Sequence, residues 1–84
     1  MNAKARKTLT AIFTDPVRSD LGWEEVEALF RTLGADIRQG RGSRVRIALG
    51  QQVAVFHRPH PRPTLLKAAV KDLRSFLASA GVMP

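Results

Sequence analysis

The sequence predicts an α+β fold in which a helix, three antiparallel strands and a second helix follow one another, with an extra helix at the N-terminus. Apolar residues recur every three or four positions near both ends of the chain, which is typical of amphipathic helices. In the central part apolar and polar residues alternate, and glycine-containing turns separate the alternating stretches, as in hairpin-connected strands. The expected order of the core is therefore α-β-β-β-α.

Two helices are expected in the first half of the chain. The first covers residues 3–14, and Pro16 ends it because the residue before a proline is pushed out of the α region. The second covers about 23–33, with Asp20 close enough to cap it and Gly34 to end it. Its apolar face consists of Trp23, Val26, Leu29, Phe30 and Leu33. Trp23 and Phe30 are therefore expected in the core rather than on a base-stacking surface.

Three strands are expected over residues 35–39, 43–49 and 52–57. Gly40-Arg41-Gly42 is the first turn, and both of its glycines are expected to take positive φ. Gly50-Gln51 fits a two-residue hairpin loop with glycine first. The proline-rich segment after the third strand excludes regular structure. The last helix is expected over 65–80, where the apolar stripe consists of Leu66, Val70, Leu73, Phe76, Leu77 and Ala80.

The two-residue loop predicts a specific register. Val45 then faces Phe56 on the side packed against the helices, and Arg44 faces His57 on the open side. Directly opposed residues of an antiparallel pair have Cβ atoms about 4.5–5.5 Å apart, so these two side chains are expected to be neighbours. A loop one residue longer would turn His57 toward the core.

The charge of the chain is strongly asymmetric. The net charge is +7, and residues 37–84 carry nine bases and one acid, whereas residues 8–36 carry six acids and two bases. Basic surfaces favour nucleic acid or anionic membrane as partners. The longest apolar run has four residues, Val53 to Phe56, so no membrane span or secretory segment is predicted and the expected compartment is the cytoplasm. A chain this short buries only about 60% of its unfolded surface, so the functional site is expected at the surface.

The order of elements, together with three local features, resembles the HicA toxin family. These features are Gly42-Ser43 before the second strand, Pro59-His60 after the third, and a closing helix that ends in Ala80-Gly81-Val82. The resemblance covers residues 21–82. It implies a fold like the double-stranded-RNA-binding domain over residues 19–84, preceded by an N-terminal helical extension over 1–18.

The resemblance also implies an activity and a partner. HicA toxins are endoribonucleases of type II toxin–antitoxin systems, which cleave messenger RNA and are neutralised by a HicB antitoxin. Most members carry a catalytic histidine directly after Gly-Ser, and here that position is Arg44. Because an arginine does not give up its proton in a protein, we expect the imidazole to come from the facing strand.

The candidate catalytic residues are therefore His57 and, second, His60. RNA is cut without metal when a base deprotonates the 2′-hydroxyl and an acid protonates the leaving oxygen, while cations hold the phosphate. The expected RNA- and phosphate-binding residues are Gly42, Ser43, Arg44, Arg46, Arg58, Lys67 and Lys71. Arg74 shares the basic face of the last helix with the two lysines. No cofactor is expected, and a His-x-x-His metal site is disfavoured because zinc requires three or four ligands.

Simpler interpretations remain open for each of these residues. His57 can be an exposed residue at a strand end, His60 can order the proline-rich turn, and the lysines can form an ordinary solvated face. Two other functions remain open as well: an RNA-binding module without catalysis, and a protein-interaction domain whose basic face pairs with an acidic partner.

Overall fold

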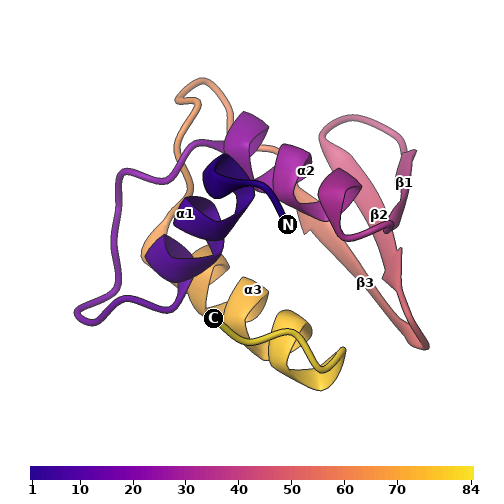
Figure 1. Ribbon diagram of the computed structural model, residues 1–84. Helices are drawn as coiled ribbons and strands as arrows, with labels where there is room; N and C mark the ends of the chain where they lie inside the picture. Colours follow the sequence, from indigo (N-terminus) through magenta and orange to yellow (C-terminus); the bar gives the residue numbers. More distant parts are fainter.

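Six elements follow in the predicted order in the computed structural model, which describes all of residues 1–84 (Figure 1). The three helices lie together on one side of a three-stranded sheet, and the other face of the sheet is open (Figure 1). The α+β prediction is confirmed. The elements are α1 (Ala3–Ile12), α2 (Trp23–Thr32), β1 (Asp36–Gln39), β2 (Arg44–Leu49), β3 (Gln52–His57) and α3 (Lys67–Ser79).

The predicted register of the central hairpin is confirmed. Leu49 is paired with Gln52, so the loop has two residues, and Arg44 is paired with His57. Gly50 has φ +60°, which supplies the left-handed conformation that a glycine-first hairpin turn requires. The alternation along β2 therefore buries Val45 and Ile47 and exposes the two arginines between and before them.

The start of α2 differs from the prediction. Gly22 is the N-cap, and no side chain caps the helix. Asp20 instead accepts two hydrogen bonds from the Arg18 guanidinium, at 2.8 and 2.6 Å, and these bonds lower the pKa of Asp20. The end of α2 is as expected, because Gly34 has φ +81° and Ala35 N–H donates back to the carbonyl of Phe30.

Two helix boundaries and one turn also differ from the sequence prediction. The last helix begins at Lys67 rather than residue 65, because Leu65 N–H donates to Leu21 O at 2.8 Å in a short bridge between the two loops. The first helix ends at Ile12, and the next residues close a tighter turn. Gly40 does not have positive φ; a Cβ there would lie 3.3 Å from the Cβ of Arg44, so close chain approach is what favours glycine.

One hydrophobic core joins all three helices to the sheet. It contains 18 buried residues, and Trp23, with 5% of its surface exposed, is among them. Phe30 of α2, Phe56 of β3 and Phe76 of α3 form a cluster with ring centroids 5.6 to 6.4 Å apart. This cluster fixes β3 against both helices, so the residue after Phe56 is held in a defined position.

The N-terminal helix packs on the rest of the molecule. Leu9 and Ile12 belong to the common core. Arg74 of α3 also forms hydrogen bonds at the end of α1. Its guanidinium donates to the carbonyl oxygens of Ile12 and Thr14 and to the carboxylate of Asp15. None of the three helices is long and apolar enough to cross a membrane.

Candidate functional site

The candidate site lies at the open end of the hairpin formed by β2 and β3. Gly42-Ser43 precedes β2, and His57 is the last residue of β3. Ser43 Oγ lies 3.5 Å from His57 Nδ1, a long contact at the limit of a hydrogen bond. Arg44 is the cross-strand partner of His57, and both side chains are exposed. An imidazole and a guanidinium therefore lie next to each other on the open side, as the register predicted.

Arg58 connects the glycine turn to β3. Its backbone N–H donates to Ser43 O at 2.8 Å, and its guanidinium donates to Gly42 O at 3.1 Å. Gly42 has φ +61°, a conformation that side chains rarely adopt. A guanidinium has five N–H donors, so Arg58 can position the turn and still present donors to a phosphate.

His60 lies beside the same turn. It lines a hollow of about 460 Å³ together with Gly42, Ser43, Arg58 and Pro59. Ser43 therefore borders both histidines, because it contacts His57 and lines the hollow with His60. The structure brings six of the predicted residues into one surface, which we call the hairpin-end site: Gly42, Ser43, Arg44, His57, Arg58 and His60.

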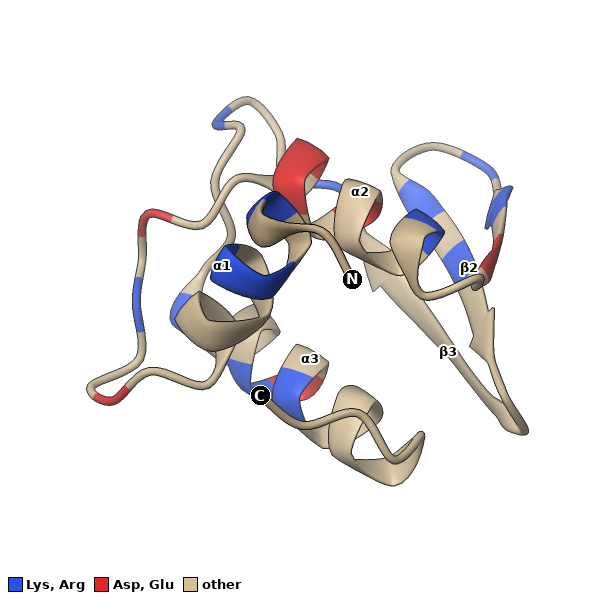
Figure 2. Ribbon diagram, in the orientation of Figure 1, with Lys and Arg blue, Asp and Glu red and all other residues tan.

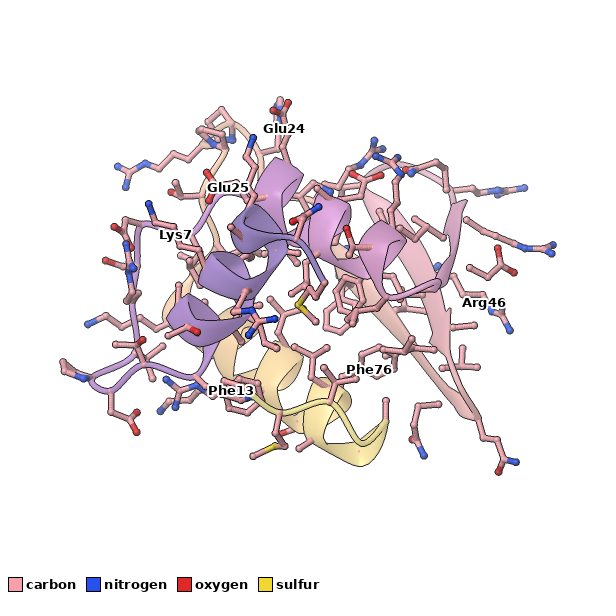
Figure 3. All side chains as sticks on the ribbon, in the orientation of Figure 1. Lys7, Phe13, Glu24, Glu25, Arg46 and Phe76 are labelled. Atoms are coloured by element: carbon pink, nitrogen blue, oxygen red, sulfur yellow. The ribbon has the colours of Figure 1, made fainter.

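The open face of the sheet extends this site with further arginines. Arg46 is exposed, forms no ion pair, and points away from the helices (Figure 3). Directly opposite it on β1 lies Arg38, which was not among the predicted site residues. Like charges directly opposed across two strands are destabilising, and Asp36 pairs with Arg38 alone. The alternation of Asp36, Ile37 and Arg38 indicates that Arg38 lies on the open face. Its position opposite Arg46, however, follows only from the register of β1 with β2.

Lys67 and Lys71 are not among the residues that line the hollows beside His57 and His60. At 100° per residue they share one flank of α3 with Arg74, whereas Leu66, Ala69 and Asp72 face β3. Arg74 was expected on a free basic face, and this expectation was wrong: its guanidinium is engaged with the end of α1. Figure 2 shows the basic residues of the sheet and those of α1 and α3 on different sides of the molecule.

The chemistry that this arrangement offers is proton transfer beside an anion. The hairpin-end site contains two imidazoles and two guanidiniums, and no carboxylate forms an ion pair with any of them. The structure contains no group of three or more His, Cys, Asp or Glu side chains placed to hold a metal ion. A phosphate diester fits such a site, because guanidiniums can bind its oxygens while an imidazole exchanges a proton.

Comparison with known proteins adds one finding. The model of a family described as the HicA toxin of bacterial toxin–antitoxin systems matches residues 23–82, from the first residue of α2 to just beyond α3. The hairpin-end site lies inside the matched segment, and α1 lies outside it. No curated protein and no solved structure matches the chain.

Proposed function

Because this chain belongs to the HicA toxin family of bacterial toxin–antitoxin systems, we propose that it is an endoribonuclease that cleaves messenger RNA at the hairpin-end site. The observation that carries the proposal is the position of His57. Its ring lies across from Arg44, the residue that stands where the family histidine is expected, and beside Ser43. The facing strand can thus supply the imidazole that position 44 lacks.

The proposed reaction begins at the 2′-hydroxyl of the RNA. A ring nitrogen of His57 accepts the hydroxyl proton while the 2′ oxygen attacks the adjacent phosphorus. The bond from phosphorus to the 5′ oxygen then breaks, and His60 donates a proton to that oxygen. The products carry a 2′,3′-cyclic phosphate and a 5′-hydroxyl. Each group that transfers a proton typically contributes about 10²–10⁴-fold in rate.

Ser43 orients the imidazole in this proposal. The contact from Ser43 Oγ is to Nδ1, which leaves Nε2 for the substrate. A base at Nε2 requires the tautomer that carries its proton on Nδ1, and that N–H would donate to Ser43 Oγ. Arg44, Arg46 and Arg58 bind the phosphate and stabilise the charge that develops on it. Arg38 extends this surface, and a contribution of Lys67 and Lys71 to RNA binding stays a prediction.

A HicB-like antitoxin is the proposed protein partner. Family membership supports it, because the family consists of toxins of toxin–antitoxin pairs. The exposed, positively charged site also supports it, since an acidic protein surface can compete with RNA for the same guanidiniums. We therefore propose that the antitoxin inhibits cleavage by covering the hairpin-end site.

The direct test is the cleavage of RNA by the purified chain in the presence of EDTA. We expect fragments that end in a 2′,3′-cyclic phosphate, identified by mass spectrometry. Expression of the chain in bacteria should arrest growth. RNA that stays intact in the assay, together with normal growth, would refute the nuclease proposal.

A second function is favoured by Arg44 itself. Most family members carry a histidine after Gly-Ser. If His57 of β3 cannot perform the role of that histidine, the chain binds RNA without cutting it. Salt-sensitive retention of RNA with no cyclic phosphate products would support this alternative, because phosphate contacts release counterions. Detection of the cyclic products would exclude it.

A further inference from the structure

We propose that the free edge of β3, together with the apolar groove between β3 and α3, binds an extended segment of the antitoxin as a fourth strand of the sheet. The proposal rests on the proposed function only in naming an antitoxin as the partner. Its basis is the contrast between the two edges of this sheet, whose strand order is β1-β2-β3.

The edge at β1 is protected in ways that natural proteins use against unwanted strand pairing. It has four residues, and two of them, Asp36 and Arg38, are charged. Short edge strands and charged side chains prevent further pairing. The edge at β3 has six residues and has neither device on its exposed side, where Val53 and Val55 are 52% and 51% exposed.

The backbone of β3 offers unused hydrogen-bonding groups in regular order. Arg58 N–H donates to Ser43 O, so bonds between β2 and β3 occur at every second pair, counted from this one. The N–H and C=O groups of Val53, Val55 and His57 therefore point away from β2. None of the backbone hydrogen bonds outside the regular elements involves these three residues. An added strand would satisfy all of them.

The groove next to this edge has a place for side chains of the added strand. It has a volume of about 260 Å³ and lies between the end of β3 and the first turns of α3. Its lining is mostly apolar, and at its rim Leu66 is 79% exposed, the most exposed large apolar side chain of the chain. An extended segment alternates its side chains between two faces. One set would fill the groove, and the other would cover Val53 and Val55.

The charge around the edge selects an acidic protein segment as the occupant. Arg46 is the cross-strand neighbour of Val55, Arg44 is the neighbour of His57, and Arg58 lines the groove. Asp72 is the one acid of the lining. A second copy of this chain is disfavoured because each copy carries a net charge of +7. RNA is disfavoured because an apolar groove and unpaired backbone groups match a peptide strand rather than phosphates.

The position of the added strand explains how binding would stop the reaction. A strand paired along β3 passes beside His57, which is the last residue of β3. Its side chains on the open face would then occupy the space between His57 and the RNA phosphate. Inhibition therefore needs no change in the conformation of the hairpin-end site.

The experiment uses the full chain and, as the probe, the protein encoded by the open reading frame next to its gene. Backbone amide exchange is measured by NMR for the free chain and for the complex. We expect the amides of Val53, Val55 and His57 to exchange at least tenfold more slowly in the complex, and those of β1 to be unchanged. A variant, Val53→Pro, removes one outward N–H of this edge without adding charge, and it should bind the probe at least tenfold more weakly.

The matched control is Gln39→Pro on the opposite edge, where the N–H also points away from β2, and this variant should bind the probe within twofold of the wild-type chain. Both proline variants should keep the RNA cleavage rate of the wild type, because they add no charge to the RNA-binding surface and the replaced residues lie outside the catalytic groups. Cleavage by the free chain is measured in parallel. If the free chain does not cleave RNA, the nuclease proposal is wrong. The amide exchange rates still test whether the β3 edge binds the probe.

Four results would overturn the docking proposal. The probe could fail to bind, or it could bind and inhibit cleavage while the three amides exchange as in the free chain. If RNA slows the exchange of the same three amides, RNA rather than the antitoxin occupies the β3 edge. A dimer in sedimentation velocity that Val53→Pro abolishes would make a second copy the occupant.

Discussion

At the scale of single residues, the position of His57 depends on Gly50. The positive φ of this glycine permits the two-residue loop, and the loop sets the register in which His57 and Arg44 are partners. Because side chains alternate along a strand, one additional loop residue would bury the ring. The burial of Phe56 in the core then determines which face His57 occupies. The catalytic proposal therefore rests on one turn and one aromatic residue.

Replacement of His57 by alanine tests the catalytic proposal. We expect cleavage to fall by about 10²–10⁴-fold, because a group that transfers a proton is lost. RNA binding should change little, since the arginines stay in place. Both quantities can be measured on one RNA substrate, by gel-based cleavage rates and by fluorescence anisotropy. His60→Ala is the matched comparison, and full activity of His57→Ala would remove this residue from the mechanism.

The opposition of Arg44 and His57 could be predicted from the sequence because a two-residue loop has only one register that keeps Phe56 inside. The register also places Ser43 beside this pair, but the specific contact of its Oγ with His57 Nδ1 depends on how Arg58 holds the turn through Gly42 O and Ser43 O. Arg38 was also missed, because its partner is known only once the pairing of β1 with β2 is fixed.

At the scale of elements, α1 is held by side chains of two kinds. Leu9 and Ile12 bury apolar surface, and Arg74 satisfies carbonyl groups at the helix end, which have no partner within the helix. Hydrogen bonds to a charged group are each worth about 1.5–3 kcal/mol. Because Arg74 side-chain exposure is only 20%, these bonds are partly shielded from water.

Replacement of Arg74 by methionine is expected to lower the free energy of unfolding by about 2 kcal/mol, less than the sum over three bonds, because water can replace the lost donors at acceptors that are only partly buried or exposed. Methionine keeps part of the apolar volume, so the loss reports the hydrogen bonds to Ile12 O, Thr14 O and Asp15. The measurement is urea unfolding followed by circular dichroism. Lys71→Met, one turn earlier on the same flank, should change stability by less than about 0.5 kcal/mol. Equal stabilities of the two variants would contradict this account.

The type and order of the elements could be predicted because each has a clear apolar period, but their ends could not. The local sequence predicted that Asp20 caps the start of α2, whereas its carboxylate accepts hydrogen bonds from Arg18. The same pattern predicted that the last helix starts at residue 65, whereas Leu65 N–H donates to Leu21 O in another loop and the extended Leu66 is the N-cap. In both cases a contact outside the helix decided its boundary.

At the scale of the whole molecule, most acids lie on α2 or in the loop before it, whereas basic residues lie on the sheet and on the helices (Figure 2). The acids of α2 and of the preceding loop are partly neutralised by ion pairs such as Arg31 with Glu27. The arginines of β2 have no such partners. The division into an extension over 1–18 and a domain over 19–84 stays a prediction, although the core crosses it.

The unpaired arginines should determine how RNA binding depends on salt. For single-stranded RNA the slope of log K against log salt is about −0.7 per neutralised phosphate. We expect Arg46→Ala to weaken binding and to reduce the magnitude of this slope by about 0.7. Titrations by fluorescence anisotropy at several potassium chloride concentrations measure it. Arg31→Ala, which removes a base already paired with Glu27, should leave the slope unchanged, and a common slope for all three proteins would place RNA elsewhere.

The attachment of α1 through Arg74 has an evolutionary consequence. The arginine lies within the segment that the family model matches, but the groups it binds lie at the end of α1 and just after it, outside that segment. The two features are useful only in combination, so natural selection should retain or discard them jointly. Homologues that begin at α2 should accept almost any polar side chain at position 74, whereas those that keep the leading helix should keep the guanidinium.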